Sequence, residues 1–247
     1  MKYLAPILLL SLLPLAAQAT AERTLTAVTP MQGVSKVSFN AGVGELRVKP
    51  SPDESVHVKV ILERKSHNFL WFFHWGSQGT QHEIEQVSLQ QQRQQGSVSY
   101  SLAYPSHLDE GDIKQHWEIE VPARLAVKIK MKVGEVRLDG TAGGVNVGLD
   151  VGEVVLNTLA GPMQVEVNVG EIRATSASTQ PGNIKMSTTI GDIHLNMNDW
   201  HGGDTHRNGL GRSLNVKGQG PDSMDLAVNI GEVGLRIEPA AAGGKQL

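Results

Sequence analysis

Apolar and polar residues alternate along most of the chain with a period of two. In one clear segment, Val165, Val167 and Val169 alternate with Glu166 and Asn168. This pattern is typical of a β-strand that buries one face. No segment between such stretches has helical periodicity, so the sequence predicts an all-β fold. The positions expected to face the core include Ile129, Met131, Val133, Val165, Val167 and Val169.

A short motif, apolar–Gly–acid–apolar, interrupts the alternation at intervals. After the glycine the alternation resumes one residue out of phase, so that Val136 and Leu138 are expected to face inward. Glycine adopts positive φ without strain, and it can therefore form a corner at which the chain turns while its apolar side stays inside. The glycines predicted to form these corners are Gly44, Gly134, Gly152, Gly170, Gly191 and Gly231.

The intervals between these glycines predict a repeated coil. Gly134, Gly152 and Gly170 are 18 residues apart. The longer gap from Gly191 to Gly231 divides into two steps of 20 at Leu210–Gly211, where a further turn of the coil is expected. This spacing favours a β-solenoid, a single-stranded parallel β-helix with one turn per repeat. The alternative architecture is an antiparallel meander or sandwich.

The first part of the chain is less regular. It predicts a first turn of the coil over 34–48, a strand over 56–62, a hairpin of 83–89 and 98–104 across a Gln-rich tip at 90–95, and a strand over 117–121. We therefore expect a single β-solenoid domain over residues 20–238. It would have an irregular N-terminal cap and a hairpin insertion over 63–97.

Two stretches of the sequence resemble a known family. Trp117–Pro122 leads through an alternating strand into Val133–Val136, and the early segment Val43–Val48 is followed by a charged turn and another apolar strand. This arrangement is similar to the bacterial putative-adhesin family of unknown function, over residues 34–238. The resemblance implies a toast-rack fold, a form of single-stranded β-helix. Our sequence departs from the family pattern in two ways: valine replaces the usual serine before the glycine, and an insertion occupies 69–75.

The N-terminus has the features of a signal peptide. Lys2 precedes an apolar run over 4–15, and Ala17–Ala19 forms a small-x-small cleavage site. Residues 1–19 are therefore expected to be cleaved during export to the periplasm or the extracellular space. The run is shorter than the roughly 20 apolar residues of a membrane span, and no transmembrane segment is expected in the mature chain. The small, polar residues 239–247 are expected to form a disordered tail.

Composition narrows the possible partners. The chain has no cysteine, so its stability must come from packing and backbone hydrogen bonds rather than from disulfides. Its net charge of −3 argues against nucleic acid, which usually requires a basic face. The 27 glycines are periodic, which indicates a repeat rather than disorder.

An aromatic insertion is the most unusual segment, because strand alternation fails there. Its large side chains could bind an envelope protein, a glycan or a membrane surface. The segment could instead cap the open end of the solenoid. A third alternative is a metal site formed by the neighbouring His67, His74 and His82. The aromatic residues of the predicted binding surface are Phe69, Trp71, Phe72, Phe73 and Trp75.

The acids that follow the corner glycines are a second candidate binding site. In a stacked coil, Glu135, Glu153 and Glu171 would form a column that could hold Ca²⁺. Arg137 and Arg173, however, follow two residues after an acid on the same outward side, and His194 follows Asp192 in the same way. We therefore favour a column of paired, solvated acids.

The loop 199–207 is a third candidate binding site. His201, Asp204 and His206 could bind a metal, but their spacing matches no known motif, and a solvated turn is the favoured interpretation. We expect no metal and no other cofactor.

The sequence lacks the common catalytic motifs. It contains no cysteine nucleophile, Gly-x-Ser-x-Gly elbow, His-Glu-x-x-His or phosphate-binding loop. The prediction is an exported, non-catalytic adhesin-like or binding module of the bacterial cell envelope rather than an enzyme. One alternative is a periplasmic structural or envelope-stress protein. Another is a polysaccharide-active β-helix enzyme.

Overall fold

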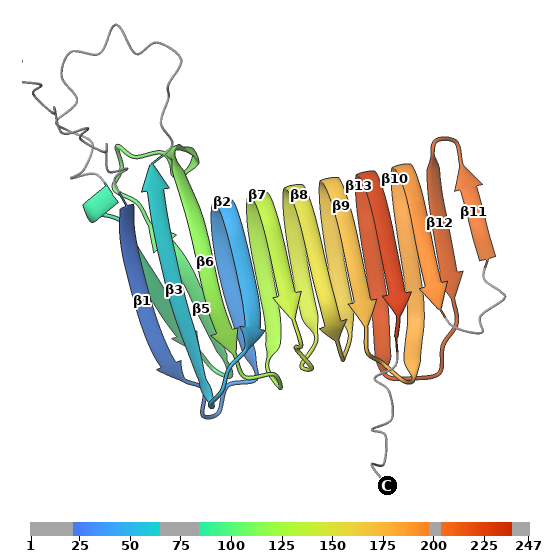
Figure 1. The fold of residues 1–247 in the computed structure, drawn as a ribbon, viewed down its shortest axis with the longest axis horizontal. Coiled ribbons are helices and arrows are strands. Elements are labelled where there is room, and N and C mark those ends of the chain that lie inside the picture. Colours follow the sequence, from blue (N-terminus) through green and yellow to red (C-terminus); the bar gives the residue numbers. More distant parts are fainter. Residues whose placement is uncertain (1–21, 65–83, 198–203, 239–247) are drawn as a thin grey trace, which may run out of the picture.

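The computed structural model describes residues 22–64, 84–197 and 204–238, and these form an all-β fold with one large mixed sheet (Figure 1). The predicted signal peptide, the aromatic residues of the insertion and the C-terminal tail lie outside the described residues. The elements are β1 (Glu22–Pro30), β2 (Lys36–Pro50), β3 (Ser55–Arg64), β4 (Ser88–Gln94), β5 (Ser97–Ala103), the 3-10 helix η1 (Glu110–Asp112), β6 (Ile113–Val121), β7 (Ala126–Asp139), β8 (Val145–Leu159), β9 (Met163–Ser176), β10 (Pro181–Met197), β11 (Asp204–Asn208), β12 (Gly211–Val216) and β13 (Asp222–Ile237).

Six long parallel strands form the centre of the sheet, in the order β2, β7, β8, β9, β13 and β10. Each contains one corner glycine, which divides it into a first half and a second half. The pairing register places these glycines side by side, so that equivalent positions of neighbouring strands align across the six strands.

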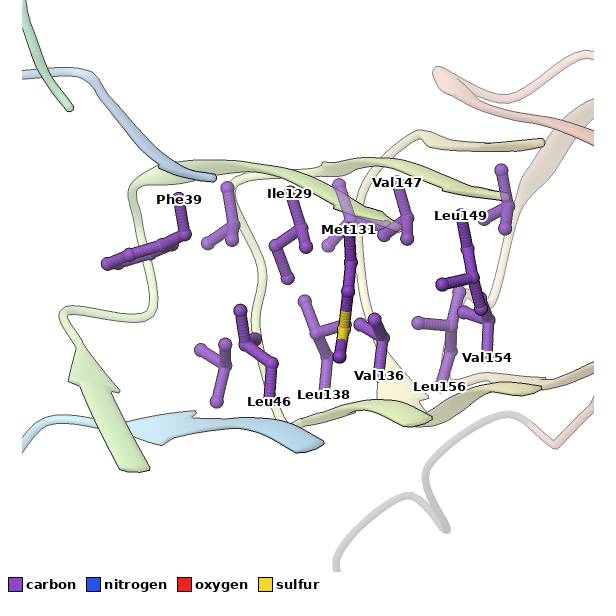
Figure 2. Close-up of a cluster of buried hydrophobic side chains, with 14 of the residues drawn as sticks. Phe39, Leu46, Ile129, Met131, Val136, Leu138, Val147, Leu149, Val154 and Leu156 are labelled. Carbon is purple, nitrogen blue, oxygen red and sulfur yellow. The ribbon is translucent and has the colours of Figure 1, made fainter. Parts of the chain in front are cut away.

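The hydrophobic core lies between the two halves of the bent strands. Figure 2 shows Ile129 and Val147 of the first halves pointing toward Leu138 and Leu156 of the second halves. All four side chains are buried. The alternating apolar positions of both halves are thus removed from water together, which stabilises the two layers by about 25 cal/mol per Å² of apolar surface.

Glycine is required at the corners for two reasons: the backbone conformation there, and the lack of space for a side chain. Their φ angles lie between 136° and 145°, a region that disfavours L side chains. A Cβ added at Gly152 would lie 1.9 Å from the carbonyl oxygen of Gly134, and one added at Gly170 would lie 1.7 Å from that of Gly152. The in-register stack therefore leaves no room for a methyl group at its corners.

The apolar residue before each corner glycine is not in the core, so the sequence prediction for Val133 and Val169 was wrong. These side chains are 41% and 43% exposed, whereas Met131 and Val136 on either side of the corner are buried. The core ends at Met131, and the chain passes around the corner beyond it. The register aligns these positions into a row on the corner: Val43, Val133, Val151, Val169, Ile230 and Ile190.

The order of strands in the sheet departs from the order along the chain. β13, the last strand of the described residues, lies between β9 and β10, and β2 lies between β6 and β7 (Figure 1). The further turn of coil predicted at Leu210–Gly211 was wrong. Residues 209–210 instead connect β11 to β12, which pair antiparallel, and β12 runs antiparallel to the first half of β10. Gly209 is the first of the two loop residues and has φ 62°, which matches the glycine that a type II′ hairpin turn requires at this position.

The N-terminal strands extend both layers of the stack. The second half of β2 pairs with β6, which is followed by β3 and β1. The first half of β2 pairs with β5, which forms the predicted hairpin with β4. The Gln-rich segment 90–94 lies within β4 rather than at the hairpin tip, because the connection is short and contains Gly96 with φ 70°.

Candidate binding face

The two outer surfaces of the stack differ in how their charges are paired. We call the outer surface of the second halves the charged face and that of the first halves the polar face. On the charged face, the acids after the corner glycines align in register as an acid row. Its members are Glu45, Glu135, Glu153, Glu171, Glu232 and Asp192.

Ion pairs neutralise most of the acid row, which confirms the paired interpretation. Arg137 contacts Glu135 at 3.2 Å, and Arg173 bridges Glu171 and Glu153. Asp192 pairs with Arg212 of β12, at 2.7 Å, rather than with the predicted His194. Within the described residues, no group of three or more His, Asp or Glu side chains could hold a metal ion.

These ion pairs should contribute little to stability. We expect Arg173→Ala to lower the free energy of unfolding by no more than about 1 kcal/mol, because exposed pairs are screened by solvent. The side chain of Arg173 is 54% exposed. Urea unfolding measures the change, and Arg236→Ala, on an exposed ion pair of β13 with Glu238, is the control. A loss of several kcal/mol, or a rise in melting temperature on addition of Ca²⁺, would contradict this account of the acid row.

The N-terminal part of the charged face is paired in the same way. Lys49 contacts Glu120 at 2.9 Å, and Lys59 contacts Glu118 at 3.0 Å. Beside β3, hydrogen bonds from His57 and from the Ser55 amide hold the pKa of the Asp53 carboxyl below its usual value. The charges of this face are thus largely satisfied within the molecule.

The polar face leaves several charges without an internal partner. Within the described residues, Lys128 and Lys130 of β7 and Glu166 of β9 make no ion pair or hydrogen bond. Amide side chains form hydrogen bonds across the strands instead: Asn146 donates to Gln164 at 2.6 Å. Two neighbouring rows of this face align in register: Ser38, Lys128, Asn146, Gln164, Asp225 and Lys185; and Asn40, Lys130, Gly148, Glu166, Ala227 and Ser187.

Gly148 opens a hollow in the polar face. No atom lies within 4 Å of the position that a Cβ at Gly148 would occupy. The hollow has a volume of about 570 Å³, with Lys130 on one side of the glycine and Glu166 on the other. A second hollow of about 360 Å³ lies on the same face and is lined by Lys128, Asn146 and Gln164, among others.

A buried polar network supports the rim of the first hollow. Gln115, which is fully buried, accepts hydrogen bonds from the Gly42 amide at 3.1 Å and from the Trp117 indole at 2.9 Å. Its amide donates to the Tyr104 hydroxyl at 2.7 Å. Burial, and next the charge of Glu110, raise the pKa of the Tyr104 phenol. Glu110 pairs with Lys132 at the hollow.

Most of the binding residues predicted from the sequence lie outside the described residues. Phe69, Trp71, Phe72, Phe73 and Trp75 lie outside the described residues, as do His67, His74, His82 and His201. Asp204 and His206 belong to β11, whose backbone alone is described. None of the helices in the described part of the chain is long and apolar enough to cross a membrane.

Comparison with known proteins identifies similarity in fold. No protein-family model matches the sequence, and no curated protein is similar to it. The solved structure of a putative cell adhesion protein from Clostridium sporogenes is similar with a TM-score of 0.54 and 14% identity, over 88% of this chain and 100% of that one. A putative adhesin from Bacteroides fragilis has a TM-score of 0.31 and 11% identity, over 87% of this chain and 97% of that one. A putative lipid binding protein from Parabacteroides distasonis has a TM-score of 0.24 and 8% identity, over 90% and 98%.

The first of these likenesses confirms, at the level of the fold, the resemblance to putative adhesins that the sequence predicted. At 14% identity it carries no residue roles from that protein to this one. Any functional surface must therefore be argued from the residues of this chain.

Proposed function

We propose that the protein is an exported, non-catalytic binding module of the bacterial cell envelope, adhesin-like, which binds its ligand through the polar face. One observation carries the proposal: the polar face holds Lys128, Lys130 and Glu166 without ionic partners, while the opposite face pairs most of its charges internally. Unpaired charges on a fixed surface are available to a ligand.

The scaffold makes such a face suitable for binding. The side chains project from strands held in register by continuous pairing with both neighbours. A ligand therefore meets donors and acceptors that are already in place, which reduces the entropy lost on binding. Binding residues on strands are also held more precisely than binding residues on loops.

The proposal also covers the architecture of the fold and the cellular location of the protein. We take the stack to be a β-solenoid, toast-rack-like, in which β13 interrupts the sequential order of the coils. We take residues 1–19 to be a signal peptide that sends the chain to the periplasm or the cell surface. The putative cell adhesion protein that is similar in fold agrees with a binding module rather than with an enzyme.

The test is binding of the labelled mature protein to envelope fractions of its own organism. We expect saturable binding, and we expect the triple variant Lys128→Ala, Lys130→Ala, Glu166→Ala to bind at least about tenfold more weakly, because three charged contacts would be lost. The matched control is Lys49→Ala, Lys59→Ala, Glu118→Ala, which removes two lysines and one glutamate from the charged face. The proposal would be overturned if the wild type did not bind envelope fractions, or if both triple variants lost the same amount of binding affinity.

The aromatic insertion remains a second candidate surface. Replacing Trp71, Phe72 and Trp75 by Ser removes most of the contact area that aromatic side chains provide. If this variant is folded and loses envelope binding while the polar-face variant keeps it, the insertion is the docking surface and the polar face is not.

A further inference from the structure

The two hollows of the polar face adjoin each other, and we infer that they form one trough along β8 that binds an extended acidic polysaccharide, a chain of sugars that carries carboxylates. This inference rests on the proposed function and names the ligand class of the same face. Lys128 and Lys130 would bind the carboxylates, and the amides of β8 and β9 would bind the hydroxyl groups.

The register places the two hollows next to each other on the same strands. One hollow contains the row Lys130–Gly148–Glu166, and the other contains the row Lys128–Asn146–Gln164. These rows lie two residues apart on the same three adjacent strands. The lining residues of β8 extend from Val145 to Asp150, a length of roughly 17 Å at about 3.3 Å per residue. The trough is thus long enough for several sugar units rather than for a single small molecule.

The two sides of the trough have different chemistry. The β7 side presents Lys128 and Lys130, whose charges have no partner within the described residues. They are two residues apart on one strand, so their Cα atoms are separated by about 6.6 Å. On the β9 side, Gln164 and Glu166 offer an amide and a carboxylate. Lys36 also lines the trough without an ion pair, so three unpaired cations face two carboxylates without an ion pair, Glu166 and Asp150. The trough therefore favours a ligand with carboxylates along one edge.

Several other charges near the trough are held in ion pairs. Lys132 pairs with Glu110, and Lys185 contacts Asp225 at 3.6 Å. Asp150 accepts a hydrogen bond from Asn168 at 3.3 Å. The unpaired lysines Lys36, Lys128 and Lys130 therefore outnumber the carboxylates without an ion pair by one.

The form of the trough favours a polysaccharide over a polypeptide. Extended peptides usually bind at the edge of a sheet, where they pair with free backbone groups and place side chains in apolar pockets. Here β8 is paired on both sides, and its outward positions along the trough are Asn146, Gly148 and Asp150. Side-chain amides and charges are instead suited to hydroxyl and carboxylate groups.

Gly148 allows the trough to be closed without disturbing the fold. Because a Cβ there meets no atom within 4 Å, Gly148→Trp should fold normally and fill the trough. Ser187→Trp is the matched control: it lies on the same row of the polar face, on β10, beyond β9 and β13.

The experiment measures binding of the full-length mature protein to polygalacturonate by calorimetry, with dextran as the uncharged polymer and polyglutamate as the carboxylated polypeptide. We expect the wild type to bind polygalacturonate in preference to both, and Gly148→Trp and Lys128→Glu, Lys130→Glu each to bind at least about tenfold more weakly. Ser187→Trp should bind like the wild type. Circular dichroism would confirm that each variant is folded.

Three results would overturn the inference while leaving the proposed function intact. The first is binding of the wild type to envelope fractions but not to polygalacturonate, with both measured in one experiment. Equal affinity for polyglutamate would show that charge alone is recognised, and equal affinity of Gly148→Trp and Ser187→Trp would place the site outside the trough. Absence of wild-type binding to envelope fractions would instead overturn the proposed function.

Discussion

Replacing Gly152 by Ala should lower the free energy of unfolding by at least about 3 kcal/mol, or prevent folding. The added methyl group would lie 1.9 Å from the carbonyl oxygen of Gly134, where no side chain can be accommodated. The φ of 138° is itself strained for an L side chain, at a cost of about 1–3 kcal/mol. Relieving the clash requires β7 and β8 to separate at the corner. Urea unfolding followed by circular dichroism measures the loss.

Gly148→Ala is the control for this prediction, because it changes a glycine of the same strand. At Gly148 a Cβ meets no atom within 4 Å. Alanine restricts the unfolded chain more than glycine does, so the variant should be as stable as the wild type or more stable by up to about 1 kcal/mol. If the two variants unfold at the same urea concentration, close stacking at the corners is not what requires glycine at position 152.

The second large effect is expected at Gln115. Gln115→Ala should cost about 2–4 kcal/mol, because it leaves the Gly42 amide and the Trp117 indole without an acceptor in a buried site. The variant also opens a cavity beside the Tyr104 hydroxyl. Thermal unfolding and near-UV circular dichroism of Trp117 report the change.

Gln164→Ala is the corresponding control on the surface. Gln164 also hydrogen-bonds through its amide, but the contact with Asn146 is exposed to solvent, which replaces it. We expect a change of no more than about 0.5 kcal/mol. Equal effects of the two substitutions would show that the buried network contributes no more than a surface amide pair.

The sequence predicted the all-β class because its signals are local. Alternation with a period of two determines which side of a strand is buried, and it placed Ile129, Leu138 and Val165 correctly. It failed at Val133, where alternation continues along the chain although the core ends at the previous inward residue, Met131. A sequence pattern records orientation, but it does not record how far the core extends.

Strand order was not predictable from the spacing of the glycines. The interval from Gly191 to Gly231 is close to two repeats, and it was interpreted as an extra turn of coil. Gly209 within that interval was the available signal for a hairpin instead. Which neighbour β13 would join depends on contacts between distant segments, and no local pattern encodes them.

The polar face was missed because its residues look unremarkable along the sequence. Lys128 and Lys130 occupy ordinary outward positions, and only the register places them beside Gly148 and near Glu166. Gln115 did carry a signal, since it is a polar residue at an inward position of 113–121, between Ile113 and Trp117. A polar residue in such a position must find hydrogen-bond partners inside the protein.

The position of β13 also constrains when the fold can form. Ribosomes make the chain from its N-terminus, so β9 and β10 are both synthesised before the strand that separates them. Met163 pairs with Met224, 61 residues later, and this long loop must close before the native neighbours can assemble. Until then, β9 and β10 present complementary edges that could join each other wrongly. A sheet that is completed only by β13 is well suited to delaying folding until that strand has been synthesised.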